Sequence, residues 1–358
     1  MAWQWRKGRM FKIKMKTFLF RVIGDKSRIC QMTSPRLLIL LAAICICFLM
    51  YNHLTNIRRN DEIPTFSLET MLEKHIGPIP RANTLMKQRA TSNNSYIRET
   101  NANFTGLHRK IRVLCFVLTT HESLTLKAEH VRRTWGHKCN KLLFFSSKTD
   151  DTFPAIGLDT EEGYLKLSGK TLHALTYIFH NHFNDAEWFL KADDDTFVIL
   201  ENLRYFLSDK DPNTPVFFGH RFKTILKQGF TSGGAGYVLS KEALSLYGKY
   251  GQDPKLCNTS YAAEDVDFGA CMQSIGVRLG NSTDKHGRSR FHCFHPEAHV
   301  IGQYPSWYKP YDANGAKMGE ESMSDYAVSF HYVPPQDMYL FHYFIYHLHP
   351  HGIVYNDK

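Results

Sequence analysis

The chain has 358 residues, of which 43% are hydrophobic and 22% charged, so a disordered, collagen-like or disulfide-dense class is excluded. Its formal charge of +10 suggests a nucleic-acid partner, but residues 1–36 contain ten Lys or Arg and one acid, whereas the other 322 residues contain 34 basic and 33 acidic side chains. We therefore expect no nucleic-acid-binding face.

The first predicted element is a membrane anchor over residues 37–55, an uncharged apolar run after the basic tail of residues 1–36. Its length approaches that of a membrane span, and the basic side should stay cytosolic. A cleaved signal peptide or a buried core helix are the alternatives. The long lead and the lack of a small-x-small cleavage site favour an uncleaved signal anchor. Residues 56–108 are polar and predict a lumenal stem, which leaves residues 109–358 as the folded domain.

Two further features agree with a lumenal location. Four N-glycosylation acceptors follow the anchor: Asn93, Asn103, Asn258 and Asn281. The folded domain has five cysteines, namely Cys115, Cys139, Cys257, Cys271 and Cys293. The odd number leaves at least one without an intramolecular partner, and no CxxC spacing suggests thiolate-bound zinc. Two bridges and a free thiol in an oxidising compartment is our interpretation, with the pairing left open.

From residue 111 onwards, apolar strands alternate with helical segments. The predicted strands are residues 111–119, 141–147, 187–192 and 216–219, and the predicted helices are residues 126–135, 169–183, 198–207, 241–250 and 265–275. This alternation predicts an α/β domain with a mainly parallel sheet. Ligands of such sheets bind beyond the carboxyl ends of the strands.

The acidic triplet Asp193–Asp195 directly follows an apolar strand. Because alternate residues of an extended segment face the same side, the first and third carboxylates are expected to converge. Two carboxylates suit Mg²⁺ or Mn²⁺, which would then bridge a diphosphate. A solvated acidic turn or a helix N-cap is the alternative.

Three other patterns are open to two interpretations each. Glu264 and Asp265 open a helix, where acids either stabilise the helix dipole or supply a general base. The glycines of Ser232–Leu239 suggest either close backbone approach to a ligand or a tight bend before a helix. His331, in an apolar strand, is either a core residue or a metal ligand. For the histidines of Tyr339–His351, a packed helix is favoured over a zinc site.

Taken in order, HVRRTWG (130–136), ADDDTFV (192–198), GGAG (233–236), EDV (264–266) and FHY (330–332) resemble the β1,3-glycosyltransferases of the family that includes Fringe. The longer stretches WFLKADDDTFVILENLRYFL and AAEDVDFG bring the chain nearest to the galactosyltransferases of that family that make core 1 O-glycans. The resemblance spans about residues 110–355. It implies a Rossmann-like GT-A fold in a Golgi-resident, single-pass type II membrane protein.

The implied reaction is the inverting transfer of galactose from UDP-galactose to O3 of GalNAc α-linked to Ser or Thr of glycoproteins. The implied Mn²⁺ ligands are Asp193, Asp195 and His331, and the implied base is Asp265, with Glu264 or Asp267 as fallback. Implied donor contacts are Thr119, Arg132, Lys191 and Asp194, and implied substrate contacts are Gly233, Gly234, Glu264, Trp307 and Tyr308.

The same resemblance implies disulfides Cys115–Cys139 and Cys257–Cys271, whereas the family's adjacent cysteine pair is replaced near Glu321–Met323. A homodimer and a dedicated chaperone are expected partners besides the GalNAc-modified glycoproteins. The alternatives are a β1,3-glycosyltransferase of the same family with another donor or acceptor, and a non-catalytic, chaperone-like paralogue. The retained acidic and histidine residues favour the enzyme.

Overall fold

The computed structural model describes residues 106–261 and 263–351. The predicted tail, the anchor and nearly all of the stem lie outside these residues, as do Asn93 and Asn103. Asn258 and Asn281 are both exposed. Within the described part of the chain, no helix has the length and hydropathy needed to cross a membrane.

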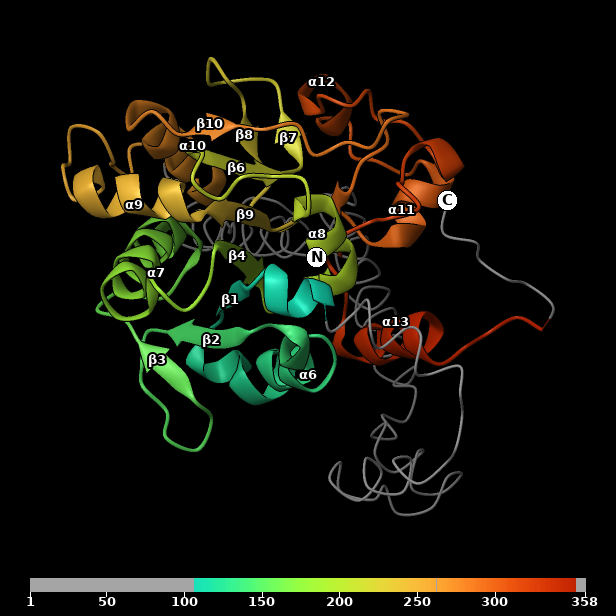
Figure 1. Ribbon diagram of the computed structural model, residues 1–358, viewed down its shortest axis with the longest axis horizontal. Helices are drawn as coiled ribbons and strands as arrows, with labels where there is room; N and C mark the ends of the chain where they lie inside the picture. The colour runs from blue at the N-terminus through green and yellow to red at the C-terminus, as the bar shows by residue number, and fades with distance from the viewer. Residues whose placement is uncertain (1–105, 262, 352–358) are drawn as a thin grey trace, which may run out of the picture. The chain divides into compact units, whose positions relative to one another are not determined.

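The described residues form a mixed α/β unit around a seven-stranded sheet of order β10-β6-β9-β4-β1-β2-β3 (Figure 1). Its strands are β1 (Val113–Leu118), β2 (Lys141–Ser146), β3 (Ala155–Gly157), β4 (Trp188–Asp193), β6 (Val216–Gly219), β9 (Tyr237–Ser240) and β10 (Arg278–Leu279). All neighbouring pairs are parallel except those of β9, which runs antiparallel to β4 and β6. A mainly parallel sheet was predicted, and β9 is the departure from it.

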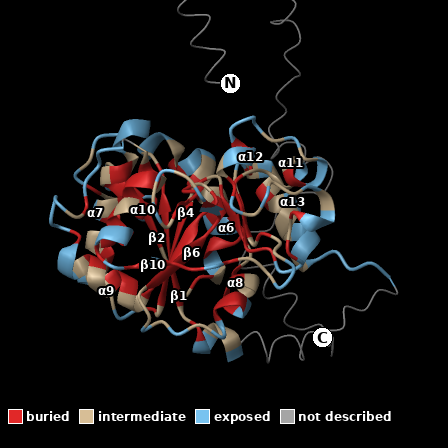
Figure 2. Cartoon of the chain, turned by 90° about the horizontal axis from the view of Figure 1, so that it is seen from above, coloured by how far each residue is buried: buried red, intermediate tan, exposed pale blue. Residues whose placement is uncertain are grey.

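Helices cover both faces of this sheet (Figure 2). They are α6 (Glu129–Arg133), α7 (Leu167–His182), α8 (Leu200–Leu207), α9 (Lys241–Tyr250), α10 (Glu264–Ser274), α11 (Pro296–Ile301), α12 (Tyr308–Tyr311) and α13 (Pro335–Tyr346). Side chains of β1 alternate between two buried clusters: Val113 and Cys115 join the cluster with α8, and Leu114 and Phe116 join the cluster with α7, α9 and α10. Burial on both faces explains why the strand is apolar throughout.

Two small sheets complete the fold. One has the order β11 (Phe291–His292), β12 (Ser329–Phe330) and β5 (Phe197–Val198), and the other pairs β7 (Arg221–Phe222) with β8 (Phe230–Thr231). The prediction of a helix from residue 198 was wrong at its start, because Phe197 and Val198 pair with β12 before α8 begins. For residues 232–239, the structure has a tight turn, in which the N–H of Gly236 donates to the carbonyl of Gly233 at 3.0 Å. This turn leads into β9 and not directly into a helix, because α9 begins only at Lys241.

Both disulfides implied by the resemblance are present. Cys115–Cys139 joins β1 to the segment before β2, and Cys257–Cys271 joins a loop to α10. Cys293 is a buried free thiol.

Trp135, from the HVRRTWG segment, connects the α6 side of the core to the segment Asp193–Asp195, called the acidic turn below. Its ring is fully buried, and its indole Nε1 donates a hydrogen bond of 2.9 Å to the carbonyl of Thr196. A rigid, buried aromatic side chain therefore fixes the backbone directly after the acidic turn.

We predict that Trp135→Phe lowers the free energy of unfolding by about 2 kcal/mol, because it leaves a buried carbonyl without its donor and a gap beside the smaller ring. Urea unfolding followed by circular dichroism measures this loss. Trp307→Phe is the matched control: Trp307 is 46% exposed, and we expect a change below about 0.5 kcal/mol. Equal losses in the two variants would contradict the anchoring role.

Candidate active site

The acidic turn lies at the carboxyl end of β4: Asp193 is the last residue of the strand, and Asp194 and Asp195 lie in the turn that follows it. One oxygen each from Asp193 and Asp195 lies within 4.8 Å of a nitrogen of His331 and of each other. Asp194 points elsewhere and accepts a 2.7 Å hydrogen bond from Thr119 Oγ1. The predicted convergence of the first and third carboxylates is confirmed, but they converge across a turn and not along an extended segment, because the N–H of Thr196 donates to the carbonyl of Asp193 at 3.1 Å. Asp194 and Thr119, two of the implied donor contacts, are bonded to each other, and their contacts with a donor stay predictions.

His331 reaches the acidic turn through strand pairing. Phe330 pairs with Phe197 in the β12–β5 ladder, so the residue after β12 comes to lie beside the residues before β5. The backbone N–H of Val333 then donates to the carbonyl of Asp195 at 2.9 Å, which closes the segment onto the turn. His331 Nε2 lies 3.2 Å from Asp195 Oδ1 and 3.9 Å from Asp193 Oδ2.

The glycine segment joins the two halves of the site. A Cβ on Gly234 would collide with the His331 ring, and a Cβ on Gly233 would collide with Glu264 and lie 3.6 Å from the Cβ of Asp265. Neighbouring glycines therefore touch the His331 cluster on one side and the start of α10 on the other. The missing Cβ atoms thus allow two functional segments to approach the same short loop, and the implied substrate contacts of Gly233 and Gly234 stay predictions.

Lys191 carries a fully buried positive charge between these segments. Its Nζ donates to Asp193 Oδ1 at 2.7 Å and to the carbonyl of Gly233 at 3.1 Å, and it lies 3.7 Å from Glu264 Oε2. Burial lowers the pKa of Lys191, but the charges of Asp193 and Glu264 outweigh that effect and raise it. The ammonium group is thus held charged and positions Asp193 and Glu264, while its implied contact with the donor stays a prediction.

Asp265 is the one acid in the first turn of α10 whose carboxylate remains available. Glu264 accepts hydrogen bonds from Thr171 and Tyr237, and Asp267 accepts one from Ser168 at 2.6 Å. These contacts fix α10 against α7 and engage the carboxylates of both predicted fallback bases, Glu264 and Asp267. The implied substrate contact of Glu264 stays a prediction.

Within this fixed turn, Asp265 Oδ1 accepts the N–H of Val266 at 2.9 Å. Burial, with the charge of Glu264, raises the pKa of Asp265 to about 6, while the Val266 N–H and Lys191 oppose that shift. A carboxyl group with a pKa near neutrality is suited to accept a proton from a hydroxyl group and release it again.

Lys127 is a site residue that the sequence did not reveal. Its Nζ lies 3.1 Å from Asp195 Oδ2 and 3.4 Å from Asp194 Oδ1. Burial alone raises the pKa of Asp195, but His331 and Lys127 outweigh it and hold that pKa well below its usual range. Asp194 shows the reverse: burial raises its pKa to about 6 against the opposing effects of Lys127 and Thr119. Lys127 precedes the HVRRTWG segment in an ordinary helical pattern, so nothing in the sequence marked it.

Three other residues with implied contacts have partners within the protein, and their contacts with donor or substrate stay predictions. The Arg132 guanidinium pairs with Glu129 at 2.7 Å and lies over the ring of Phe153. Tyr308 is only 2% exposed, so its ring has no free face on which a sugar could stack. Trp307 is partly exposed but packs edge-on against Tyr308 and the ring of Phe222.

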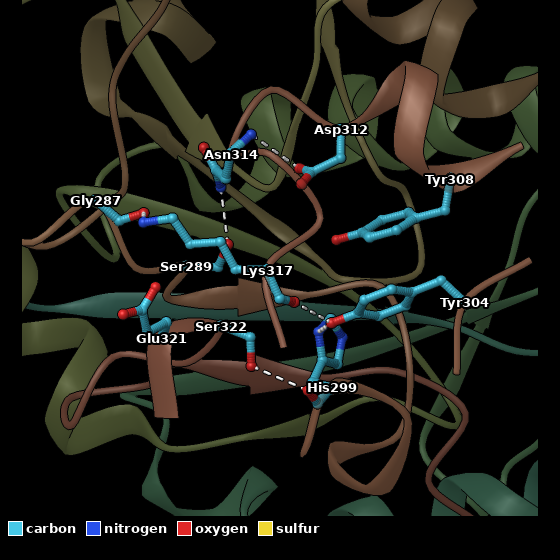
Figure 3. A pocket seen from close by; sticks show the side chains of 10 residues that line it. All are labelled: Gly287, Ser289, His299, Tyr304, Tyr308, Asp312, Asn314, Lys317, Glu321 and Ser322. Atoms are coloured by element: carbon cyan, nitrogen blue, oxygen red, sulfur yellow. Dashed lines mark hydrogen bonds between the residues drawn. The ribbon is translucent and has the colours of Figure 1, made fainter. Parts of the chain in front are cut away.

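Tyr308 also lines a small polar cavity of about 10 Å³ (Figure 3). Tyr304 Oη donates to the carbonyl of Lys317 there, and Asn314 and Asp312 close the opposite wall. A volume of this size holds about one water molecule. None of the acidic-turn residues lines the cavity, so it is separate from the candidate active site.

The donor set of Asp193, Asp195 and His331 fits a divalent cation. Two carboxylates and one imidazole suit Mg²⁺ or Mn²⁺, and the three ligand atoms already face one another. The nearby ammonium group of Lys127 shows that this position attracts positive charge. The cluster lies at the carboxyl end of β4, and β1 ends beside it, because Leu118, the last residue of β1, pairs with Asp193.

A family model described as Fringe-like matches residues 110–298. The chain is 46% identical over 264 residues to glycoprotein-N-acetylgalactosamine 3-beta-galactosyltransferase 1 of Xenopus laevis, covering 73% of each chain. It is 28% identical over 158 residues to beta-1,3-glucosyltransferase of Mus musculus, covering 42% of this chain and 31% of the relative. The chain belongs to the Fringe-like family.

Among solved structures, the galactosyltransferase LgtC aligns with 62% of this chain and 87% of its own at 12% identity, with a TM-score of 0.35. This similarity is too low to support a conclusion about the fold or the activity of this chain.

We predict that Gly234→Ala weakens Mn²⁺ binding by about tenfold or more, because the added methyl group displaces the His331 ring from the carboxylates. Electron paramagnetic resonance of free Mn²⁺ during titration measures the affinity. Gly169→Ala is the matched control, because a Cβ there meets nothing within 4 Å, and it should leave the affinity unchanged. Wild-type affinity in Gly234→Ala would argue against His331 as a ligand.

Proposed function

We propose that this chain is an inverting β1,3-galactosyltransferase of GT-A type that transfers galactose from UDP-galactose to O3 of GalNAcα-Ser/Thr on glycoproteins. The product is Galβ1-3GalNAc, the core 1 O-glycan. The single observation that carries the chemistry is the meeting of Asp193, Asp195 and His331 beside a loop whose other side touches Asp265. The choice of galactose and GalNAc follows the name of the Xenopus relative.

Asp193, Asp195 and His331 would hold the Mn²⁺ ion, which when bound supplies a Lewis acid for the diphosphate of the departing UDP. Lys191 keeps Asp193 oriented toward this position through its 2.7 Å contact. The fixed first turn of α10 presents Asp265 to the acceptor. A β-linkage formed from a UDP-α-sugar requires attack on the anomeric carbon from the face opposite UDP. The acceptor O3 would form the new bond to that carbon as its bond to UDP breaks, and the O3 proton would pass to the Asp265 carboxylate.

The proposed cellular location and membrane topology rest mainly on the sequence. The nine net positive charges of residues 1–36 precede the uncharged run of residues 37–55, a pattern that supports a single-pass type II anchor with the catalytic domain in the Golgi lumen. The two disulfides and the exposed acceptors Asn258 and Asn281 agree with an oxidising, glycosylating compartment. A homodimer and a dedicated folding chaperone are part of the same proposal.

The direct test uses the full chain from a secretory host in detergent, with a GalNAcα-Thr peptide and UDP-galactose. We expect Galβ1-3GalNAc to form with Mn²⁺ and not with a chelator. UDP-glucose, UDP-GlcNAc and UDP-glucuronate are the competing donors, and preference for one of them would replace galactose in the proposal. Folded protein that binds neither UDP nor Mn²⁺ would favour the chaperone-like alternative.

We predict that Asp265→Asn lowers kcat by about 10²–10⁴-fold, the range for loss of a general base, while the Kd values for UDP and Mn²⁺ stay within about threefold of wild type. Steady-state kinetics and calorimetry provide the two measurements. The isosteric amide keeps the local shape, so a fall in UDP affinity equal to the fall in kcat would assign Asp265 to donor binding.

The pH dependence follows from the same carboxylate. Because Asp265 must be ionised to accept a proton and its pKa is about 6, kcat/KM should fall as the pH decreases through about 6. Asp194→Asn is the control, since the pKa of Asp194 is also about 6. The acid limb should persist in that variant, and its disappearance would assign the limb to Asp194.

A further inference from the structure

Lys127 is a cationic residue at the acidic turn that remains open to solvent. Its side chain is 39% exposed, and its Nζ lies 3.1 Å from Asp195 Oδ2 and 3.4 Å from Asp194 Oδ1. Lys191 also pairs with the acidic turn, but its side chain is only 2% exposed. A ligand that arrives from solvent can therefore reach the ammonium group of Lys127 more easily than that of Lys191.

The backbone around Lys127 fixes the position from which its side chain reaches the acidic turn. Residues Leu124–Ala128 form a π-helical turn, η3, in which the N–H of Glu129 donates to the carbonyl of Leu124, five residues earlier. Turns of this kind are rare and frequently lie at functional sites. Leu124 and Ala128 are both buried, so the turn is fixed on both sides of Lys127. The long, flexible side chain can thus change its partner without a movement of the main chain.

Asp195 is shared between Lys127 and the candidate metal cluster. Its Oδ1 lies 3.2 Å from His331 Nε2, and its Oδ2 faces the ammonium group of Lys127. A divalent cation bound by the cluster would share the Asp195 carboxylate with this ammonium group, and two positive charges beside one carboxylate repel each other. The charge of Lys127 is therefore expected to lower the affinity of the cluster for a cation that binds alone.

A diphosphate changes this balance of charges. In sites of this kind, the cation bridges protein carboxylates and the phosphate oxygens of a nucleotide. A diphosphate bound to the cation must come close to the ammonium group of Lys127, because cation and ammonium group flank the same carboxylate. Lysine is a common phosphate ligand, since its compact charge carries three hydrogen-bond donors. The negative charge of the diphosphate would therefore offset the repulsion and give Lys127 a partner.

We propose that Lys127 makes the site select the cation–diphosphate pair over the bare cation: its ammonium group contacts the diphosphate of the sugar nucleotide and opposes binding of the divalent cation alone. The inference rests on the proposed function in taking UDP as the nucleotide, since other nucleoside diphosphates present the same group. A lysine that only neutralised Asp194 and Asp195 would behave differently. Its loss would strengthen cation binding and leave UDP binding unchanged.

The test measures two dissociation constants with the full-length protein at constant ionic strength. Electron paramagnetic resonance of free Mn²⁺ gives the Kd for Mn²⁺ without nucleotide, and calorimetry gives the Kd for UDP at saturating Mn²⁺. In Lys127→Met, which removes the charge and keeps an unbranched side chain, we expect the Mn²⁺ Kd to fall by about threefold or more, because a repulsion is lost. The UDP Kd should rise by about tenfold or more, because a charged contact with phosphate is lost.

Further variants make the result specific. Lys127→Arg keeps the charge and can donate to phosphate, so both constants should stay within about threefold of wild type. Lys141→Met is the matched control: it removes an exposed lysine at the start of β2, at the end of the parallel sheet opposite to the acidic turn, and both constants should stay within about twofold of wild type.

Thermal unfolding shows whether each variant is folded, and Lys127→Gln provides a second uncharged variant if the methionine variant is unstable. The proposal requires both changes. In a folded uncharged variant, an Mn²⁺ Kd that does not fall, or a UDP Kd within about threefold of wild type, would overturn it. A rise of the UDP Kd in Lys127→Arg equal to that in Lys127→Met would also overturn it, because the charge would then not be the cause.

The proposed function can fail separately. If the wild-type protein transfers no galactose, the two dissociation constants still test Lys127, because neither measurement requires turnover. If the wild-type protein binds Mn²⁺ but not UDP, inorganic pyrophosphate replaces UDP as the probe, and the same opposite changes in Lys127→Met would support the proposal. Wild-type protein that binds no Mn²⁺, or that binds Mn²⁺ but neither UDP nor pyrophosphate, would reject it.

Discussion

The candidate active site depends on the antiparallel pairing of β12 with β5. This short ladder brings His331 from the C-terminal part of the chain to the two carboxylates that follow β4, and the Val333 N–H closes the contact on the carbonyl of Asp195. The candidate metal site needs this pairing, because without it the acidic turn offers two carboxylates and no imidazole.

A second constraint is the buried charge of Lys191. It contacts Asp193 on the metal side and Glu264 on the α10 side, so it neutralises both acids in an interior where unpaired charges are costly. Because Glu264 is also bound to Thr171 and Tyr237, the neighbouring Asp265 is left as the acid with an available carboxylate. The spatial relation between candidate base and candidate metal site is thus set by one ammonium group and two adjacent glycines.

Much of the main sheet could be predicted from the sequence, because long apolar runs are local signals. The convergence of Asp193 and Asp195 was predicted from alternation along an extended segment, whereas the structure achieves it through a turn. The strand Val216–Gly219 and the helix Lys241–Tyr250 were predicted with the observed bounds. β5 was not recognised because it has only two residues, and β9 was not recognised because it runs directly into α9. Lys127 was missed for another reason: its importance depends on tertiary contacts with the acidic turn, which lies far away in the sequence. Tyr308, which the resemblance implied as a substrate contact, is 2% exposed and packs in the interior.

We propose that Asp193, Asp195 and His331 bind one divalent cation together, and pulsed electron paramagnetic resonance of Mn²⁺ bound to the full-length protein tests this, because a coordinated imidazole nitrogen couples to the electron spin. We expect a single nitrogen coupling that changes on ¹⁵N-histidine labelling and disappears in His331→Gln. Bound Mn²⁺ with no nitrogen coupling, or a coupling that survives in His331→Gln, would show that His331 is not a ligand.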